Sequence, residues 1–100
     1  MKLGILVNTD KHLEDIIGLT KSALSKGHEV TMFTMDEGTN FFTDPSFTEL
    51  SKLQGVTMSF CDHSAKQLNA KTDGLPSEIT SGSQYDNAAM YNSCDKSIVL

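Results

Sequence analysis

The sequence predicts an α/β fold: a flavodoxin-like parallel sheet of four to five strands with helices on both faces. Three observations lead to this prediction. Short apolar runs without polar alternation are typical of strands buried on both faces. Segments between these runs repeat apolar residues at helical spacing, and the two kinds of segment alternate along the chain. Since 100 residues suit one compact domain, we expect residues 1–100 to form a single α/β domain.

The N-terminal third predicts a strand, a helix and a second strand. Leu3–Val7 is continuously apolar and predicts the first strand. Asp10 offers an N-cap to a helix that ends at Gly27, because glycine commonly terminates helices. Glu29–Met35 predicts the second strand, and residues 36–40 predict a loop.

The middle of the chain predicts a second helix and a third strand. Before them stands Phe41-Phe42, an apolar pair that forms an interface, covers a pocket or packs beneath its own loop. Asp44-Pro45 predicts the start of the helix, with aspartate as N-cap and proline at the first helical position, and Gly55 predicts its end. Val56–Phe60 predicts the third strand, which Cys61 terminates.

The last third predicts two helices and a closing strand. Ser64 to Gln67 has the pattern of a capping box, so we expect a helix that begins between residues 62 and 64 and ends near Ala70. Residues 71–80 predict a mobile loop. Ser81 to Gln84 resembles a second capping box that opens the last helix, and Ser97–Leu100 predicts the final strand.

The expected strand order is 2-1-3-4, as in flavodoxin-like sheets. Ligands of open α/β sheets bind beyond the carboxyl ends of the strands, near the point where the strand order reverses. In this order that point lies between the first and third strands, whose following loops begin at Asn8 and Cys61. Both residues are therefore candidate site residues.

Composition excludes several classes of partner. The net charge is −5, and all eight basic residues are lysines without any arginine, which argues against nucleic acid and against an anionic membrane surface. No targeting segment and no run long enough to span a membrane is visible. We therefore expect a cytoplasmic protein whose two cysteines are reduced thiols.

Cys61 is the residue best placed for chemistry. It follows a buried strand and precedes a helix, and the free N–H groups at a helix start favour a thiolate. His63, Ser64 and Lys66 would support this anion, whereas Asp62 would oppose it. A small, inert core thiol is the other interpretation, and the sequence leaves both open.

The second cysteine, Cys94, stands just before the last strand. We expect it to be packed and inert. A resolving role would require its sulfur to approach that of Cys61 closely.

Patterns for other site chemistries are missing. The three histidines have no metal-ligand spacing with one another or with the cysteines. The turn that follows the first strand, residues 8–11, contains no glycine and so lacks a P-loop or dinucleotide-binding fingerprint. We therefore expect neither a metal nor an organic cofactor.

Four segments carry a family resemblance: Lys2–Asn8, Gly27–Phe33, Gly55–Cys61 and Asp95–Leu100. With them the chain resembles, over nearly its whole length, the DsrE/DsrF-like proteins, which include the TusD-type sulfur-relay subunits. The resemblance implies a single DsrE-like domain with a flavodoxin-like fold, in trimers, hexamers or mixed-subunit hexamers. It also implies that Cys61 carries a persulfide. The chain departs from many members in having no second cysteine shortly after Cys61.

The leading hypothesis is a small sulfur-relay protein, a sulfur carrier or sulfurtransferase. It would carry persulfide sulfur on Cys61 between donor and acceptor proteins, as a homo-oligomer or with related subunits. One alternative is a non-enzymatic oligomeric binding or scaffold module with a packed, inert Cys61. Another is a protein that binds a small molecule, such as a nucleotide or a thiol compound, in the same crevice.

Overall fold

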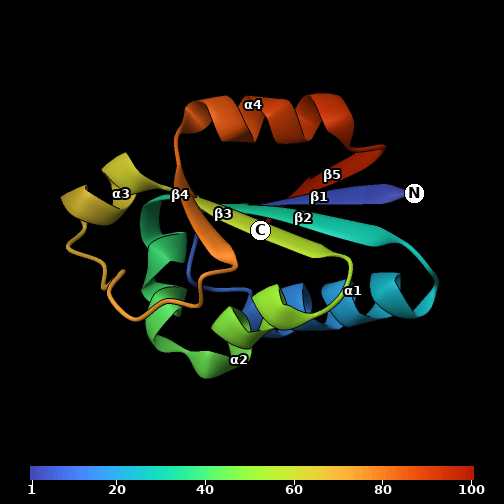
Figure 1. Cartoon of the computed structure of the whole chain (residues 1–100), viewed down its shortest axis with the longest axis horizontal. Coiled ribbons are helices and arrows are strands. Elements are labelled where there is room, and N and C mark those ends of the chain that lie inside the picture. The colour runs from blue at the N-terminus through green and yellow to red at the C-terminus, as the bar shows by residue number, and fades with distance from the viewer.

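The computed structural model describes residues 1–100 and contains one sheet of five parallel strands (Figure 1). In spatial order the sheet is β4-β3-β2-β1-β5. The strands are β1 (Lys2–Val7), β2 (Glu29–Thr34), β3 (Val56–Cys61), β4 (Ile79–Gly82) and β5 (Lys96–Val99). The predicted fold class, a parallel α/β sheet of four to five strands with helices on both faces, is confirmed.

Helices cover the sheet unequally. On one face lie α1 (Leu13–Ser25) and α2 (Pro45–Thr48), and on the other lies α4 (Gln84–Ser93) (Figure 1). Short 3-10 helices, η1 (Asp36–Thr43) and η2 (Glu49–Lys52), flank α2, and α3 (Asp62–Gln67) extends from the end of β3 (Figure 1). None of these helices combines the length and apolar character that crossing a membrane requires.

The predicted strand order 2-1-3-4, in which the fourth strand is the C-terminal one (β5 in the structure), is wrong. β2 lies between β1 and β3, with Leu6 beside Phe33 and Phe33 beside Ser59, while β5 pairs with the other edge of β1. The strand order therefore reverses between β1 and β5, and the carboxyl end of β3 adjoins those of β2 and β4. The error has a physical cause: apolar patterns identify strands, but pairing partners depend on long-range packing.

β4 was not predicted, because Ile79 and Thr80 fall at the end of the expected loop over 71–80, and Ser81 and Gly82 fall in the expected capping box. Ile79 is the one apolar residue in the strand and is buried, and the strand is held by pairing with β3. The last helix consequently begins later than expected. Ser83, not Ser81, is its N-cap, and Asp86 completes the capping box by accepting a hydrogen bond from the Ser83 N–H at 2.8 Å.

The N-caps of two other helices differ from their predictions. Asp10 is not a cap: α1 begins after His12, which makes no side-chain cap, and Asp10 accepts a hydrogen bond from Asn40 Nδ2 at 2.9 Å. The start of α3 at Asp62 lies within the predicted range of 62 to 64, but Ser64 lies inside the helix and the N-cap is Cys61. The helix ends at Gln67, short of Ala70, because Asn69 takes a left-handed conformation with φ of 52°.

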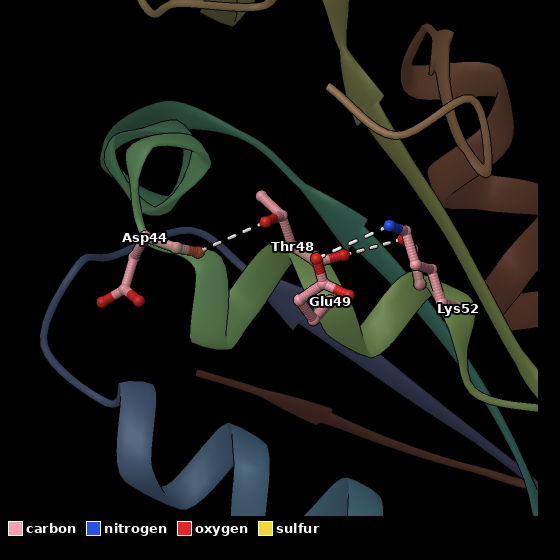
Figure 2. Close-up of polar contacts among 5 residues, drawn as sticks. Asp44, Thr48, Glu49 and Lys52 are labelled. Atoms are coloured by element: carbon pink, nitrogen blue, oxygen red, sulfur yellow. Dashed lines mark hydrogen bonds and ion pairs between the residues drawn. The ribbon is translucent and has the colours of Figure 1, made fainter. Parts of the chain in front are cut away.

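The predicted start at Asp44 and Pro45 is correct. The Asp44 carboxylate accepts a hydrogen bond from the Ser46 N–H at 2.9 Å, and Pro45 is the first helical residue. Figure 2 shows the turn that follows, in which the Thr48 hydroxyl donates to the Asp44 carbonyl and an ion pair joins Glu49 to Lys52 at 3.5 Å. The segment turns from α2 into η2 and ends at Lys52, before the predicted stop at Gly55.

The larger core lies on the side of α1 and α2. Phe41 and Phe42 belong to it, each only 7 % exposed, and Phe42 packs edge-on against Phe60 with ring centroids 5.1 Å apart. The interpretation that this pair packs beneath its loop is therefore confirmed. On the α4 side the buried cluster has four members only, which are Leu6, Phe33, Cys61 and Met90.

Candidate functional site

Cys61 joins β3 to α3. It is the last residue of the strand and the N-cap of the helix, and its extended backbone (φ −79°, ψ 110°) lets the side chain turn back over the first helical turn. Its Sγ accepts a hydrogen bond from the Ser64 N–H at 3.5 Å. Serine, threonine, aspartate or asparagine usually makes this contact, so here a sulfur atom satisfies a free N–H group of the helix start.

The surroundings of Cys61 favour its thiolate. Burial raises the pKa of the thiol, since only 4 % of the residue is exposed. Hydrogen bonds from the side chain and backbone of Ser64 lower it, and smaller contributions come from the Gln84 side chain and the His63 backbone. These donors outweigh burial, so the pKa of Cys61 lies below the ordinary value of a cysteine.

The sulfur opens onto a pocket of about 600 Å³. The pocket lies at the carboxyl ends of three adjacent strands, β2, β3 and β4, where the loops of a parallel sheet meet. It is lined by Met35, Asp36, Cys61, Asp62, His63, Ser64, Gln67, Gly82, Ser83 and Gln84. A nearly buried sulfur thus faces a space large enough to admit another molecule.

Gly82 allows the start of α4 to approach Cys61. The two residues are partners in the β3–β4 register. A Cβ atom on Gly82 would collide with the Asp86 carboxylate, which caps the Ser83 N–H. Glycine here therefore permits a capped second helix to begin beside the sulfur.

The opposite rim of the pocket carries an unusual backbone conformation. Asp36, which directly follows Met35 at the end of β2, has φ of 49°, in the left-handed region that residues other than glycine seldom adopt. The Thr39 hydroxyl donates to the Asp36 carbonyl at 2.8 Å and holds this turn. The turn directs the chain into η1 and places Asp36 at the pocket.

The structure brings some of the predicted site residues together and separates others. His63 and Ser64 line the pocket with Cys61. Lys66 does not: it is exposed and pairs with Asp62 at 2.9 Å, and this contact raises the pKa of Lys66. Asn8, half-buried after β1, also lies outside the lining, because β3 is not the neighbour of β1.

Sequence reasoning missed the part of the pocket that β2 and β4 contribute. Gln84 and Ser83 were assigned to a helix start but not to the site, because β4 was not recognised and its position beside β3 was unknown. Met35 and Asp36 were not candidates either, since the expected strand order placed the second strand away from the third. Only the capping-box pattern near Ser83 could have signalled a helix start here.

Cys94 is distant from this site. It is half-buried at the C-terminal end of α4 and packs against Gly4 near the start of β1. The ten residues of α4, about 15 Å of helix, separate it from Gln84 at the pocket. Since a disulfide requires Cα atoms within about 7 Å, Cys94 does not resolve Cys61 within one chain.

The structure contains no preformed site for a metal ion. Nowhere do three or more His, Cys, Asp or Glu side chains gather in an arrangement that could hold a metal ion. His12 pairs with Asp15 at 3.6 Å, and His28 contacts the N-terminal amine at 3.3 Å. The functional groups that line the pocket are the Cys61 thiol, the Met35 thioether, the His63 imidazole, and the hydroxyl, amide and carboxylate groups of the serines, glutamines and aspartates.

Comparison with known proteins identifies relatives in structure and none in sequence. No protein-family model matches the chain, and no curated protein matches it by sequence. Among solved structures, the ychN protein from E. coli superposes with a TM-score of 0.76 at 15 % identity over the full length of both chains. MTH1491 from Methanobacterium thermoautotrophicum, described as a protein of unknown function, gives a TM-score of 0.78 at 13 % identity, covering 99 % of this chain and 98 % of that one. At such identities the likeness establishes the fold alone.

Proposed function

We propose that this protein is a sulfur carrier that holds persulfide sulfur on Cys61. The observation that carries the proposal is the state of this cysteine: its pKa is lowered by donated hydrogen bonds, and its sulfur faces a pocket of about 600 Å³. A thiolate with access to solvent is the nucleophile that thiol–persulfide exchange requires. The resemblance of the strand segments to DsrE/DsrF-like proteins agrees with this chemistry.

The transfer consists of two displacements at sulfur. In the first, the Cys61 thiolate attacks the outer sulfur of a donor persulfide, R–S–SH. An S–S bond to Cys61 forms while the donor's S–S bond breaks, and the donor leaves as the thiolate R–S⁻. The outer sulfur, now on Cys61, exchanges its proton with water and so also exists as the anion Cys61–S–S⁻. In the second, an acceptor thiolate attacks the outer sulfur and Cys61 leaves as the thiolate. Electrons balance without an external oxidant or reductant.

The burial of Cys61 determines how partners reach it. With 4 % of the residue exposed, the flat surface of another protein cannot contact the sulfur directly. The donor and acceptor thiols must enter the pocket on an extended or protruding segment. The proposed partners are donor and acceptor proteins that present their thiols on such a segment.

The proposal includes a homo-oligomer. Exposed apolar side chains on α4 and on the edge strand β5 support this part, since such side chains are candidates for contact with a second copy of the chain. Tyr85 is 80 % exposed and Val99 54 %, and Tyr91 and Ile98 are also exposed. Analytical ultracentrifugation would test it, and a monomer at micromolar concentration would contradict it.

A non-enzymatic scaffold with an inert Cys61 is the second candidate. The observation that favours it is the packing of Cys61 in the small core cluster with Leu6, Phe33 and Met90. The two candidates differ in thiol reactivity. Native Cys61 should react rapidly with a small disulfide reagent near neutral pH if it is a sulfur carrier, and only after unfolding if it is a packing residue.

Mass spectrometry after incubation with a persulfide donor tests the proposal directly. We expect the native chain to gain the mass of one sulfur atom and a reductant to remove it. Cys61→Ser should abolish the gain, and the matched variant Cys94→Ser should retain it. A wild-type chain that gains no sulfur, or a gain that persists in Cys61→Ser, would refute the proposal.

A further inference from the structure

Two amide side chains at the start of α4 form a hydrogen-bonded pair beside the pocket. Asn87 Nδ2 donates to Gln84 Oε1 at 3.1 Å, one helical turn away. With its oxygen thus engaged, Gln84 turns its NH₂ group toward Met35, where Nε2 lies 3.6 Å from Sδ. Hydrogen bonding from the Gln84 side chain also lowers the pKa of Cys61. Gln84, Met35 and Cys61 all line the same pocket.

From this geometry we infer that Gln84 is the donor that stabilises the outer sulfur during transfer, and that Asn87 is the positioning residue that keeps the Gln84 amide in the required orientation. A glutamine amide has a donor end and an acceptor end of nearly equal size. If the Gln84 oxygen faced an anionic sulfur, the two negative groups would repel each other. The bond from Asn87 favours the orientation that places the donor end toward Cys61.

The position of Gln84 distinguishes it from Ser64. Ser64 is buried, at 5 % exposure, and its N–H contacts the Cys61 sulfur from within α3. Gln84 is exposed and reaches the pocket from another helix. The outer sulfur of a persulfide lies about 2 Å beyond the cysteine sulfur, so a side chain on the open side can follow it there. The thioether of Met35, a weak acceptor, is readily replaced by an anionic sulfur.

The pH dependence of Cys61 alkylation tests the role of Gln84. Measurements are made in a Cys94→Ser background, so that Cys61 is the one reacting thiol. We expect Gln84→Glu to move the midpoint of the profile upward by about one pH unit, which corresponds to about 1.4 kcal/mol, since it replaces a donor by a carboxylate. Every variant keeps the other titratable side chains near the sulfur, which are Asp36, Asp62 and His63 at the pocket and Asp86 on α4.

Gln67→Glu is the matched control. It adds the same charge at the same pocket, but removes no donor from the sulfur. We therefore expect a displacement of the midpoint less than half as large. Equal displacements in the two variants would refute the hydrogen-bonding role of Gln84, because charge alone would then explain both.

A double-mutant cycle tests whether Asn87 acts through Gln84. Asn87→Ala alone should move the midpoint upward by a smaller amount than Gln84→Glu. In the Gln84→Glu background it should have no further effect, because the amide that Asn87 orients is gone. Additive effects would show that Asn87 acts on its own and would overturn the pairing.

This inference rests on the proposed function for its use in transfer, but the two can fail separately. If the wild-type chain gains sulfur and Gln84→Glu leaves the alkylation profile unchanged, the sulfur carrier stands and the role of Gln84 is refuted. If the profile moves as expected and no variant gains sulfur, the thiolate site stands and sulfur transfer is refuted.

Discussion

Gly38 lies where the chain has no room for a side chain, and replacing it by alanine tests how the pocket rim is held. The residue is buried in η1, two positions after Asp36, and packs directly on the end of β1. An added Cβ atom would collide with the Val7 carbonyl oxygen, and would lie 2.9 Å from the carbonyl carbon and 3.0 Å from Cγ1 of the same residue. These neighbours are mainly backbone, so η1 must move rather than a flexible side chain.

The magnitude follows from two effects. Forcing a methyl group into a well-packed site typically costs about 1–3 kcal/mol. The same Val7 carbonyl accepts the Met35 N–H at 2.9 Å, and weakening this hydrogen bond adds about 1 kcal/mol. We therefore expect Gly38→Ala to lower the free energy of unfolding by about 2–4 kcal/mol, a large part of the stability of a small domain.

Urea unfolding followed by circular dichroism provides the measurement, with Gly18→Ala as the matched control. Gly18 lies inside α1 with no atom within 4 Å of an added Cβ. Because alanine is the better helix former, this control should gain about 0.5–1 kcal/mol. If Gly38→Ala unfolds within about 0.5 kcal/mol of wild type, the close contact between η1 and β1 does not restrain the rim, and the reasoning is refuted.

Two further predictions concern Cys61. Removing the Ser64 hydroxyl by Ser64→Ala should raise the pKa of the Cys61 thiol, because hydrogen bonding from Ser64 is the largest influence that lowers it. The ultraviolet absorbance of the thiolate, followed against pH, should then appear at higher pH. An unchanged titration would contradict the role of Ser64. Linkage predicts a pH-dependent stability: since the pKa of Cys61 is lower in the folded than in the unfolded chain, the thiolate stabilises the fold above the ordinary thiol pKa, and this contribution is lost as the pH falls through the folded value. The free energy of unfolding of wild type relative to Cys61→Ser should therefore increase with pH in that interval, and a constant difference would show that the folded pKa is not lowered.

Local patterns predicted the parts of the fold that local physics controls. The apolar runs at residues 3–7 and 56–60 became β1 and β3, and Asp44 with Pro45 began a helix, because strand burial and helix capping depend on neighbouring residues. The placement of Cys61 at a strand end before a helix was likewise readable from the sequence. Its role as the N-cap itself was not, since cysteine seldom occupies that position.

The pocket depended on contacts that no local pattern specifies. Ile79–Gly82 became a strand by pairing with β3. Its β-branched residues Ile79 and Thr80 favour a strand, but they are too few to predict one without that partner. With that pairing, Gln84 came to the pocket of Cys61 from another helix, with Asn87 hydrogen-bonded to it, while Asn8 was left outside the pocket. The sequence by itself determined a parallel α/β chain with a cysteine at a strand end. Which strands adjoin that cysteine, and hence which side chains act on its sulfur, was decided by long-range pairing, whose free energy comes from residues far apart in the chain.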